Sequence, residues 1–347
     1  MKTYEELKTA IDALFDLCER LTETHPWLVC IVMHELARNT YPNDPFIPFL
    51  KEKSATERLY DVIMNLIQFI KLGSLLGSYH RFNKNNVEYG EVKKSTGEIY
   101  GKLWSKFTPN QLSEKATRIL TERLQKNGIS TAIIVGKNAV DVGCGSGRFS
   151  LALKNLGASS VVGVDYGDCG LEIGRKTALE IGLHGVEFKK EDILNLSFPN
   201  ETFDFTFSNG VIHHSESMEK ALHELFRITK PGGHIWLYIY ADGGIFWYAR
   251  KRMPMIMKNI PQDYTIRIMD DLGMPSDRFI FTDNWYVPIE THTSLEKSME
   301  MLKKFCPQEI TRLEYGRDTD LDYHSIHGNE DDKVIYGDGE LRFIIKK

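Results

Sequence analysis

A glycine-rich loop between two patterned segments constrains the fold of this chain more than any other feature. Ala139 to Val142 form a short apolar run that predicts a buried strand, and Gly143-Cys144-Gly145-Ser146-Gly147 follows directly. From Phe149 onward, apolar residues recur at helical spacing. Glycines at such a turn let the backbone approach a ligand and adopt dihedral angles closed to other residues. The loop therefore predicts a ligand-binding turn, of a kind that dinucleotide-binding folds also use.

Strand and helix patterns then alternate along the chain. The expected strands lie at 139–142, 160–165, 186–190, 203–207 and 234–240, and the expected helices at about 168–181 and 216–229. This alternation predicts an α/β fold in which a parallel sheet carries helices on both faces. A helix at 294–305 and two late strands at 310–315 and 341–345 follow, and the acidic stretch 318–338 is expected to be a surface loop.

The first 95 residues have a different, helical pattern. Tyr4 to Leu21 places apolar residues on one face, and Ser54 followed by Glu57 predicts a capping box at the start of another helix. We therefore expect a helical N-terminal region over 1–95, acting as a cap or a homodimer contact, and an α/β domain over 96–347. Residues 241–290, where the alternation loosens, are expected to form an insertion after the fifth strand that covers the substrate.

Composition and charge exclude several classes of protein. The 347 residues carry 43 lysines and arginines against 48 aspartates and glutamates, a net charge of −5, which does not suit a dedicated nucleic-acid binder. Five cysteines without a CxxC pair indicate neither a disulfide scaffold nor a zinc ribbon. The sequence shows no apolar signal core and no run of roughly 20 apolar residues that could span a membrane. We expect a reduced, cytoplasmic protein without stable membrane insertion.

The run Asp318-x-Asp320-x-Asp322 has the spacing with which a calcium-binding loop begins. Such a loop needs a glycine where Tyr323 stands and a bidentate glutamate where Asn329 stands. We therefore expect no metal site.

Five segments together resemble the class I S-adenosylmethionine-dependent methyltransferases, in particular the type 11-like group that acts on small molecules. The segments are Val140 to Gly147, Asp165, Glu191-Asp192-Ile193, Phe203 to His214, and Leu225 to Gly233. The resemblance covers about residues 135–240. It implies a Rossmann-like, seven-stranded sheet, S-adenosyl-L-methionine as the cofactor, and transfer of a methyl group to an oxygen or nitrogen of a small-molecule acceptor.

The resemblance also implies a pocket for this methyl donor. The family's acid at Asp165 accepts both ribose hydroxyls, and the acid at Asp192 contacts the adenine amino group. Asp141, two residues before the first glycine, stands where an acid can hold the cationic methionine end. Asp141 and Asp192 favour this phosphate-free donor over a dinucleotide. The expected cofactor-binding residues are Asp141, Gly143, Gly145, Gly147, Asp165, Tyr166, Asp192, Ile193 and Asn209.

Two histidines follow the fourth strand, where an acceptor would arrive. By resemblance, His214 serves as a general base or holds one in place, and His213 is a second catalytic candidate. An imidazole titrates near neutrality and suits removal of a proton from a hydroxyl or ammonium group. Alternatively, one of the two rings caps the following helix or packs against the cofactor.

Aromatic and basic residues follow the fifth strand, at the edge where ligands bind in open parallel sheets. Such side chains suit a small-molecule pocket, in which an arginine could pair with an anionic group of the acceptor. The expected substrate-binding residues are Tyr240, Trp247, Tyr248, Arg250 and Trp285. Alternatively, the rings pack the insertion against the core and the basic side chains are solvated.

Two other functions stay open from the sequence. One is an enzyme of the same fold with a sulfur or carbon acceptor, or one that adds a methylene group to a lipid double bond. Relatives of this last kind place a glutamate at the position of His213. The other is a partner or regulatory protein that binds the donor without turnover, which the intact Asp141, Asp165 and His214 disfavour.

Overall fold

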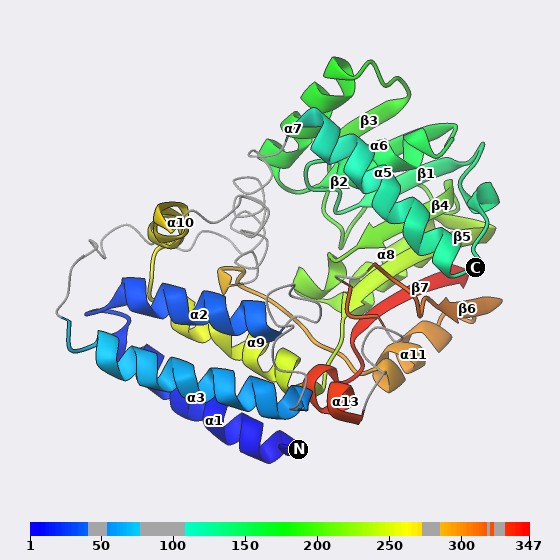
Figure 1. The fold of residues 1–347 in the computed structure, drawn as a ribbon. Coiled ribbons are helices and arrows are strands. Elements are labelled where there is room, and N and C mark those ends of the chain that lie inside the picture. The colour runs from blue at the N-terminus through cyan, green and yellow to red at the C-terminus, as the bar shows by residue number, and fades with distance from the viewer. Residues whose placement is uncertain (41–53, 77–107, 273–284, 318–319, 323–329) are drawn as a thin grey trace. The chain divides into compact units, whose positions relative to one another are not determined.

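A computed structural model of the chain describes residues 1–40, 54–76, 108–272, 285–317, 320–322 and 330–347 (Figure 1). The chain divides into two compact units, each made of segments far apart in sequence. The helical unit comprises Met1–Tyr89, Asp242–Val287 and His324–Gly339, and the sheet unit comprises Gly90–Ala241, Pro288–Tyr323 and Glu340–Lys347. Most of the segment expected as an insertion, 241–290, thus shares a unit with the N-terminal helices, and the expected boundary at 95/96 lies outside the described residues.

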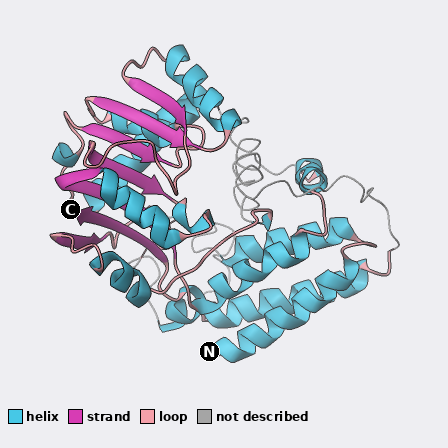
Figure 2. Cartoon of the chain, turned by 180° about the vertical axis from the view of Figure 1, so that it is seen from behind, coloured by secondary structure: helices cyan, strands magenta, loops and turns pink. Residues whose placement is uncertain are grey.

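A seven-stranded mixed sheet forms the sheet unit, in the order β3-β2-β1-β4-β5-β7-β6 (Figure 2). The strands are β1 (Asn138–Val142), β2 (Ser160–Asp165), β3 (Val186–Lys190), β4 (Phe203–Asn209), β5 (Thr229–Tyr240), β6 (Glu309–Arg312) and β7 (Glu340–Lys346). The first five strands pair in parallel, whereas β7 runs antiparallel to both β5 and β6. The prediction of a Rossmann-like, seven-stranded sheet is confirmed.

Helices accompany this sheet along the chain. They are α5 (Pro109–Lys126), α6 (Arg148–Asn155), α7 (Asp168–Glu180), α8 (Met218–Ile228) and α11 (Leu295–Lys303), with short 3₁₀ turns η2 (Thr131–Ile133) and η3 (Ile212–His214). The helix expected over 216–229 is α8, and Ser217 caps it by accepting a hydrogen bond from the backbone of Lys220. Because η3 follows β4 after two residues, it lies at the carboxyl end of that strand.

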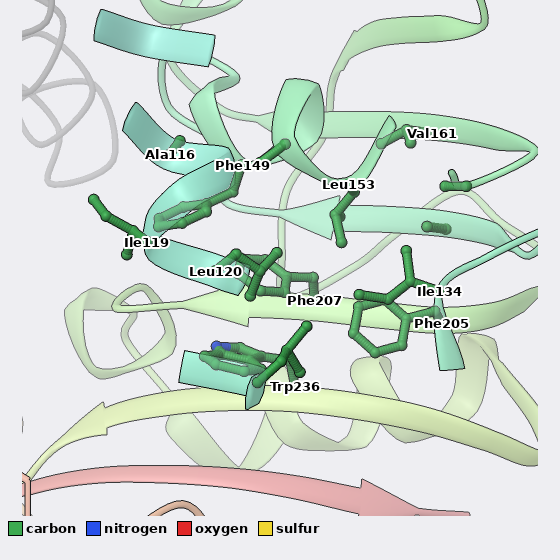
Figure 3. Packing of buried hydrophobic residues seen from close by; sticks show 14 of the residues in the cluster. Ala116, Ile119, Leu120, Ile134, Phe149, Leu153, Val161, Phe205, Phe207 and Trp236 are labelled. Carbon is green, nitrogen blue, oxygen red and sulfur yellow. The ribbon is translucent and has the colours of Figure 1, made fainter. Parts of the chain in front are cut away.

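Alternation of side chains along β4 builds the main core. Phe205 and Phe207 point to the same face, as residues two apart in a strand must, and both are fully buried. Phe207 stacks on Trp236 of β5 with ring centroids 5.4 Å apart, and Phe149 of α6 lies 5.2 Å from Phe207 (Figure 3). Leu120 of α5 belongs to the same cluster. Burial of a large apolar side chain contributes roughly 1.5–3 kcal/mol, so this cluster holds α5 and α6 on the sheet.

The opposite face of the sheet carries α8. Thr206, which lies between the two core phenylalanines of β4, is buried, and its hydroxyl lies 2.7 Å from that of Thr229. The Thr229 hydroxyl in turn donates to the carbonyl of Leu225 in α8. The ring of Phe226 in α8 stacks at 4.4 Å on that of Phe305, just after α11. Helices therefore cover both faces of the sheet, as predicted.

A buried network of charged groups joins β5 and β7. Arg342 lies 2.5 Å from Glu340 and 3.6 Å from Asp320. Asp320 also accepts two hydrogen bonds of 2.8 Å from Arg123 of α5, and the Tyr238 hydroxyl donates to Glu340 at 2.6 Å. Burial opposes the charge of Arg342, but Asp320 and Glu340 hold its pKa above the ordinary value. Asp320, from the acidic run that suggested calcium, is therefore an ion-pair partner of two arginines.

The helical unit begins with capped helices. Its helices are α1 (Tyr4–Leu21), α2 (Pro26–Thr40), α3 (Ala55–Gly73), α9 (Gly244–Met257), α10 (Gln262–Asp271) and α13 (Glu330–Tyr336). The capping box predicted between Ser54 and Glu57 is present at the start of α3. Tyr248 of α9 donates its hydroxyl to Asp12 of α1 at 2.5 Å. In the part of the chain that the structure describes, no helix combines the length and apolar character needed to cross a bilayer.

Two stretches differ from the sequence expectation. The segment after Tyr240, where the alternation loosens, forms α9 and α10, and part of the acidic stretch expected as a loop forms α13. α9 buries several adjacent residues, Phe246 and Trp247 among them, so its sequence lacks the one-sided spacing of a surface helix. Its Pro254 lies in the last turn and lacks the N–H that would donate to the carbonyl of Arg250, one turn earlier.

The charged network makes a prediction for stability. Arg342→Ala is expected to lower the free energy of unfolding by about 3 kcal/mol, because it leaves the largely buried Glu340 without its cation. Urea denaturation measures the loss. Arg118→Ala is the matched control, since Arg118 is 65% exposed beside Glu122 and should lose less than about 1 kcal/mol. Equal losses in the two variants would contradict a stabilising role for the buried network.

Candidate functional site

The glycine loop leaves β1 in a conformation that requires glycine. Gly143, Gly145 and Gly147 have φ angles of 77°, 55° and 76°, in the left-handed region. A Cβ on Gly143 would lie 2.2 Å from the Val211 side chain, and a Cβ on Gly147 would lie 2.3 Å from the Phe188 ring. The backbone angles therefore favour glycine at all three positions, and the packing also requires it at Gly143 and Gly147.

Asp165, at the end of β2, joins this loop to the loop that follows it. Its Oδ2 accepts the N–H of Gly145 and its Oδ1 accepts the N–H of Gly167, each at 2.8 Å. Burial raises the pKa of Asp165, while these N–H donors act in the opposite direction. A carboxylate has about four lone-pair sites, so these two bonds leave capacity for a pair of hydroxyls. A carboxylate with this capacity is chemically suited to accept the two hydroxyls of a ribose.

Asp141, the other acid beside the loop, lies at the end of β1 and is 2% exposed. Its Oδ2 accepts a hydrogen bond of 2.7 Å from the Ser150 hydroxyl. Burial, together with a smaller effect of the nearby charge of Asp165, raises the pKa of Asp141 to about 7. A positive charge beside this carboxyl would favour its ionised form. Asp141 is thus suited to a cationic ligand.

The remaining predicted cofactor residues follow β2, β3 and β4. Glu191 donates its N–H to the Asp165 carbonyl at 3.0 Å, which attaches the segment after β3 to the end of β2. The Asp192 carboxylate caps the same segment by accepting the N–H of Leu194 at 3.0 Å, and Ile193 is half-buried. Tyr166 is half-buried next to Asp165. These residues lie at the carboxyl ends of neighbouring parallel strands, as the sequence predicts.

Asn209, at the end of β4, uses its side-chain oxygen within the protein. The Trp236 indole N–H donates to Asn209 Oδ1 at 3.0 Å. Gly210 follows with φ 79°, and a Cβ there would lie 3.3 Å from the Tyr238 ring. The turn from β4 into η3 is thereby fixed by its neighbours on β5.

The two candidate catalytic histidines form η3 with their rings 4.3 Å apart. His213 is fully buried, and its ring lies 3.8 Å from that of Tyr240. His214 is 8% exposed, and its Nδ1 lies 2.9 Å from the carbonyl of Ile289. Since a carbonyl only accepts, Nδ1 carries the proton of a neutral ring and the basic lone pair is on Nε2. This is the tautomer that a base acting through Nε2 needs.

A carboxylate–imidazole pair that sequence reasoning misses lies close to these histidines. His292 Nε2 lies 2.7 Å from Glu290 Oε1, and the two side chains are 2% and 7% exposed. The His292 ring lies 5.9 Å from that of Tyr240. Residues two apart in an extended segment face the same way, which is the signal that could have found the pair.

The predicted substrate-binding residues divide between the two units. Tyr240 lies in the sheet unit beside His213, whereas Trp247, Tyr248, Arg250 and Trp285 lie in the helical unit. There Trp247 and Trp285 are 1% and 0% exposed, and Arg250 lies 5.8 Å from the Trp247 ring. Contact of these four with an acceptor stays a prediction. Among the described residues, no group of three His, Cys, Asp or Glu side chains is arranged to hold a metal.

Comparison with known proteins assigns the central part of the sheet unit. Residues 140–237 match a family model described as a methyltransferase domain. Over 30% of this chain, the sequence is 32% identical to the sterol 24-C-methyltransferase of Aspergillus fumigatus, of which the match covers 28%. Over 29% of this chain, it is 30% identical to the demethylmenaquinone methyltransferase of Listeria monocytogenes, of which the match covers 43%. The chain thus spans less than half the length of these relatives.

One solved structure aligns with much of this chain. It is an S-adenosylmethionine-dependent methyltransferase of Thermotoga maritima, described as a possible histamine N-methyltransferase. The alignment has a TM-score of 0.44 at 20% identity and covers 72% of this chain and 99% of that chain.

The parallel sheet, the glycine loop after β1 and the acid that closes β2 are features with which open α/β domains bind nucleoside-containing cofactors. The match over residues 140–237 supports a class I S-adenosylmethionine-dependent methyltransferase domain in this part of the chain. S-adenosyl-L-methionine is the cofactor of this family.

The buried acid makes a prediction for the pH dependence of stability. Because the folded protein holds the pKa of Asp141 at about 7, its protonation favours folding. This contribution is fully present below about pH 4, the range of an unfolded aspartate, and is lost as the pH rises through 7. Asp141→Asn stays neutral and can still accept from Ser150. Its free energy of unfolding should match that of the wild type near pH 4 and exceed it by roughly 4 kcal/mol at pH 8.

Urea denaturation at several pH values measures this difference. Asp168→Asn is the control, because the Asp168 side chain is 73% exposed beside Lys190. If the difference in the free energy of unfolding between Asp141→Asn and wild type does not increase with pH, the raised pKa of Asp141 is contradicted.

Proposed function

We propose that the protein transfers the methyl group of S-adenosyl-L-methionine to an oxygen or nitrogen of a small-molecule acceptor. The observation that supports this most is the arrangement along one sheet edge. The glycine loop, Asp165 and η3 follow the parallel strands β1, β2 and β4, whose carboxyl ends share that edge. Open parallel sheets bind their ligands there.

The donor supplies an electrophilic methyl group on a sulfonium with a good leaving group. The protein's contribution is therefore mainly to hold and orient donor and acceptor. Asp165 would accept the ribose hydroxyls with the carboxylate lone pairs that are not used by the N–H groups of Gly145 and Gly167. Asp192 would contact the adenine. Asp141 would stabilise the positive end of the donor from beneath the glycine loop.

His214 would take the proton that an oxygen or nitrogen acceptor loses. Its Nδ1 faces the Ile289 carbonyl, which leaves Nε2 as the basic atom. Tyr240, whose ring lies 3.8 Å from that of His213, is proposed to contact the acceptor. The roles expected for the N-terminal helices, as a cap or a homodimer contact, stay predictions.

A carbon acceptor is the second candidate, because one of the relatives is named a sterol 24-C-methyltransferase. The two candidates differ in the atom that receives the methyl group. Incubation with donor labelled in the methyl group, followed by NMR of the product, separates them. A label bound to oxygen or nitrogen supports the first proposal, and a label bound to carbon supports the second.

Donor binding tests the role of Asp165. Asp165→Ala should weaken binding of S-adenosyl-L-methionine and of its demethylated product by roughly 1–3 kcal/mol, because it removes a charged acceptor from two hydroxyls. Isothermal titration calorimetry measures both affinities. The exposed Asp168, three residues further along, provides the control variant Asp168→Ala, which should bind normally. Unchanged affinity in Asp165→Ala would place the ribose elsewhere.

Turnover tests the role of His214. His214→Ala should lower kcat by roughly 10²–10⁴-fold, the usual contribution of a general base, with donor affinity nearly intact. The control is His223→Ala, since the His223 side chain is 66% exposed on α8. If kcat survives in His214→Ala, another group is the base or none is needed.

A further inference from the structure

Residues 289–293 form a strap along η3 and the end of β5. Two contacts hold η3: the Ile289 carbonyl lies 2.9 Å from His214 Nδ1, and the Thr291 N–H donates to the His213 carbonyl at 2.8 Å. A third bond, from the Thr293 N–H to the Tyr240 carbonyl at 3.3 Å, holds β5. The strap therefore contacts both candidate catalytic histidines and the aromatic residue beside them.

The Glu290–His292 pair fastens this strap. His292 Nδ1 lies 2.8 Å from the Ala241 carbonyl, just after β5, while Nε2 lies 2.7 Å from Glu290 Oε1. Both ring nitrogens thus face oxygen atoms, although a neutral imidazole has a single N–H. The second contact therefore needs a further proton, carried by the ring or by the carboxyl group. Because both side chains are buried, water cannot readily replace this hydrogen bond.

We propose that Glu290 is a positioning residue, a role that rests on the proposed function of His214 as a base. Through His292, Glu290 fixes the strap to the end of β5. The fixed strap aims the Ile289 carbonyl at His214 Nδ1 and so keeps the lone pair of His214 on Nε2. Glu290 acts on the reaction through the strap and not by touching the acceptor.

Two substitutions at Glu290 distinguish positioning from other roles. In Glu290→Gln, the side-chain amide can donate to Nε2 of a neutral His292, whose Nδ1–H still donates to Ala241. The strap is then held without a carboxylate. In Glu290→Leu, the side chain fills similar space but cannot bond His292. Glu296→Leu, a change of the same type at an exposed position in the first turn of α11, is the control.

The tautomer of His214 is the first readout, because it does not depend on activity. Two-bond ¹H–¹⁵N correlation spectra of histidine-labelled protein report which ring nitrogen carries the proton, and the loss of signals in His214→Ala assigns them. Wild type, Glu290→Gln and Glu296→Leu should show the Nδ1–H form of His214. Glu290→Leu should show a mixture with the Nε2–H form. If Glu290→Leu does not fold, Glu290→Ser provides the same comparison.

Steady-state kinetics is the second readout. Glu290→Leu should lower kcat roughly ten- to hundredfold, as loss of an orienting partner does, with the donor KM within about twofold. Glu290→Gln should stay within about threefold of wild type. Wild-type tautomer and kcat in Glu290→Leu, or equal impairment in Glu290→Gln, would overturn the proposal. Absence of methyl transfer in the wild type would contradict the proposed function instead, while the spectra would still test the strap.

Discussion

The carboxylate of Asp165 is the interaction on which the site depends, because it joins two loops at one edge of the sheet. It accepts backbone N–H groups from Gly145 and Gly167, and so fixes the glycine loop relative to the end of β2. Burial raises its pKa, yet the N–H donors favour the ionised form. A carboxylate that accepts these two N–H groups keeps lone pairs with which it can accept a diol. The positions of the other cofactor residues follow from the parallel strands that end beside it.

Local patterns were sufficient to predict much of the fold. The strands of the parallel sheet, the glycine loop and the capping box at Ser54 all depend on neighbouring residues, and the structure has each of them. The family resemblance added the cofactor, which the match over residues 140–237 supports. Some strand ends differ from the prediction by a few residues. The fifth strand, predicted over 234–240, begins at Thr229, directly after α8.

Features that depend on distant residues could not be predicted. The helix α9 is covered on several sides, so its sequence lacks the one-sided pattern that indicates a helix. The bond between Ile289 and His214 joins residues 75 positions apart, and it indicates which ring nitrogen of a neutral His214 carries the proton. The contact of the Glu290–His292 pair with the end of β5 is likewise a contact between residues far apart in the sequence, so the sequence alone could not predict it. The sequence could propose His214 as a base, but it could not indicate the Ile289 carbonyl as the partner of its Nδ1.

A crystal structure with S-adenosyl-L-homocysteine tests the central claim most directly. The account predicts that the ligand lies along the carboxyl ends of β1 to β4, with its ribose hydroxyls within hydrogen-bonding distance of the Asp165 carboxylate. The sulfur should point toward η3. A ligand bound elsewhere on the sheet unit, or no bound ligand at saturating concentration, would contradict it.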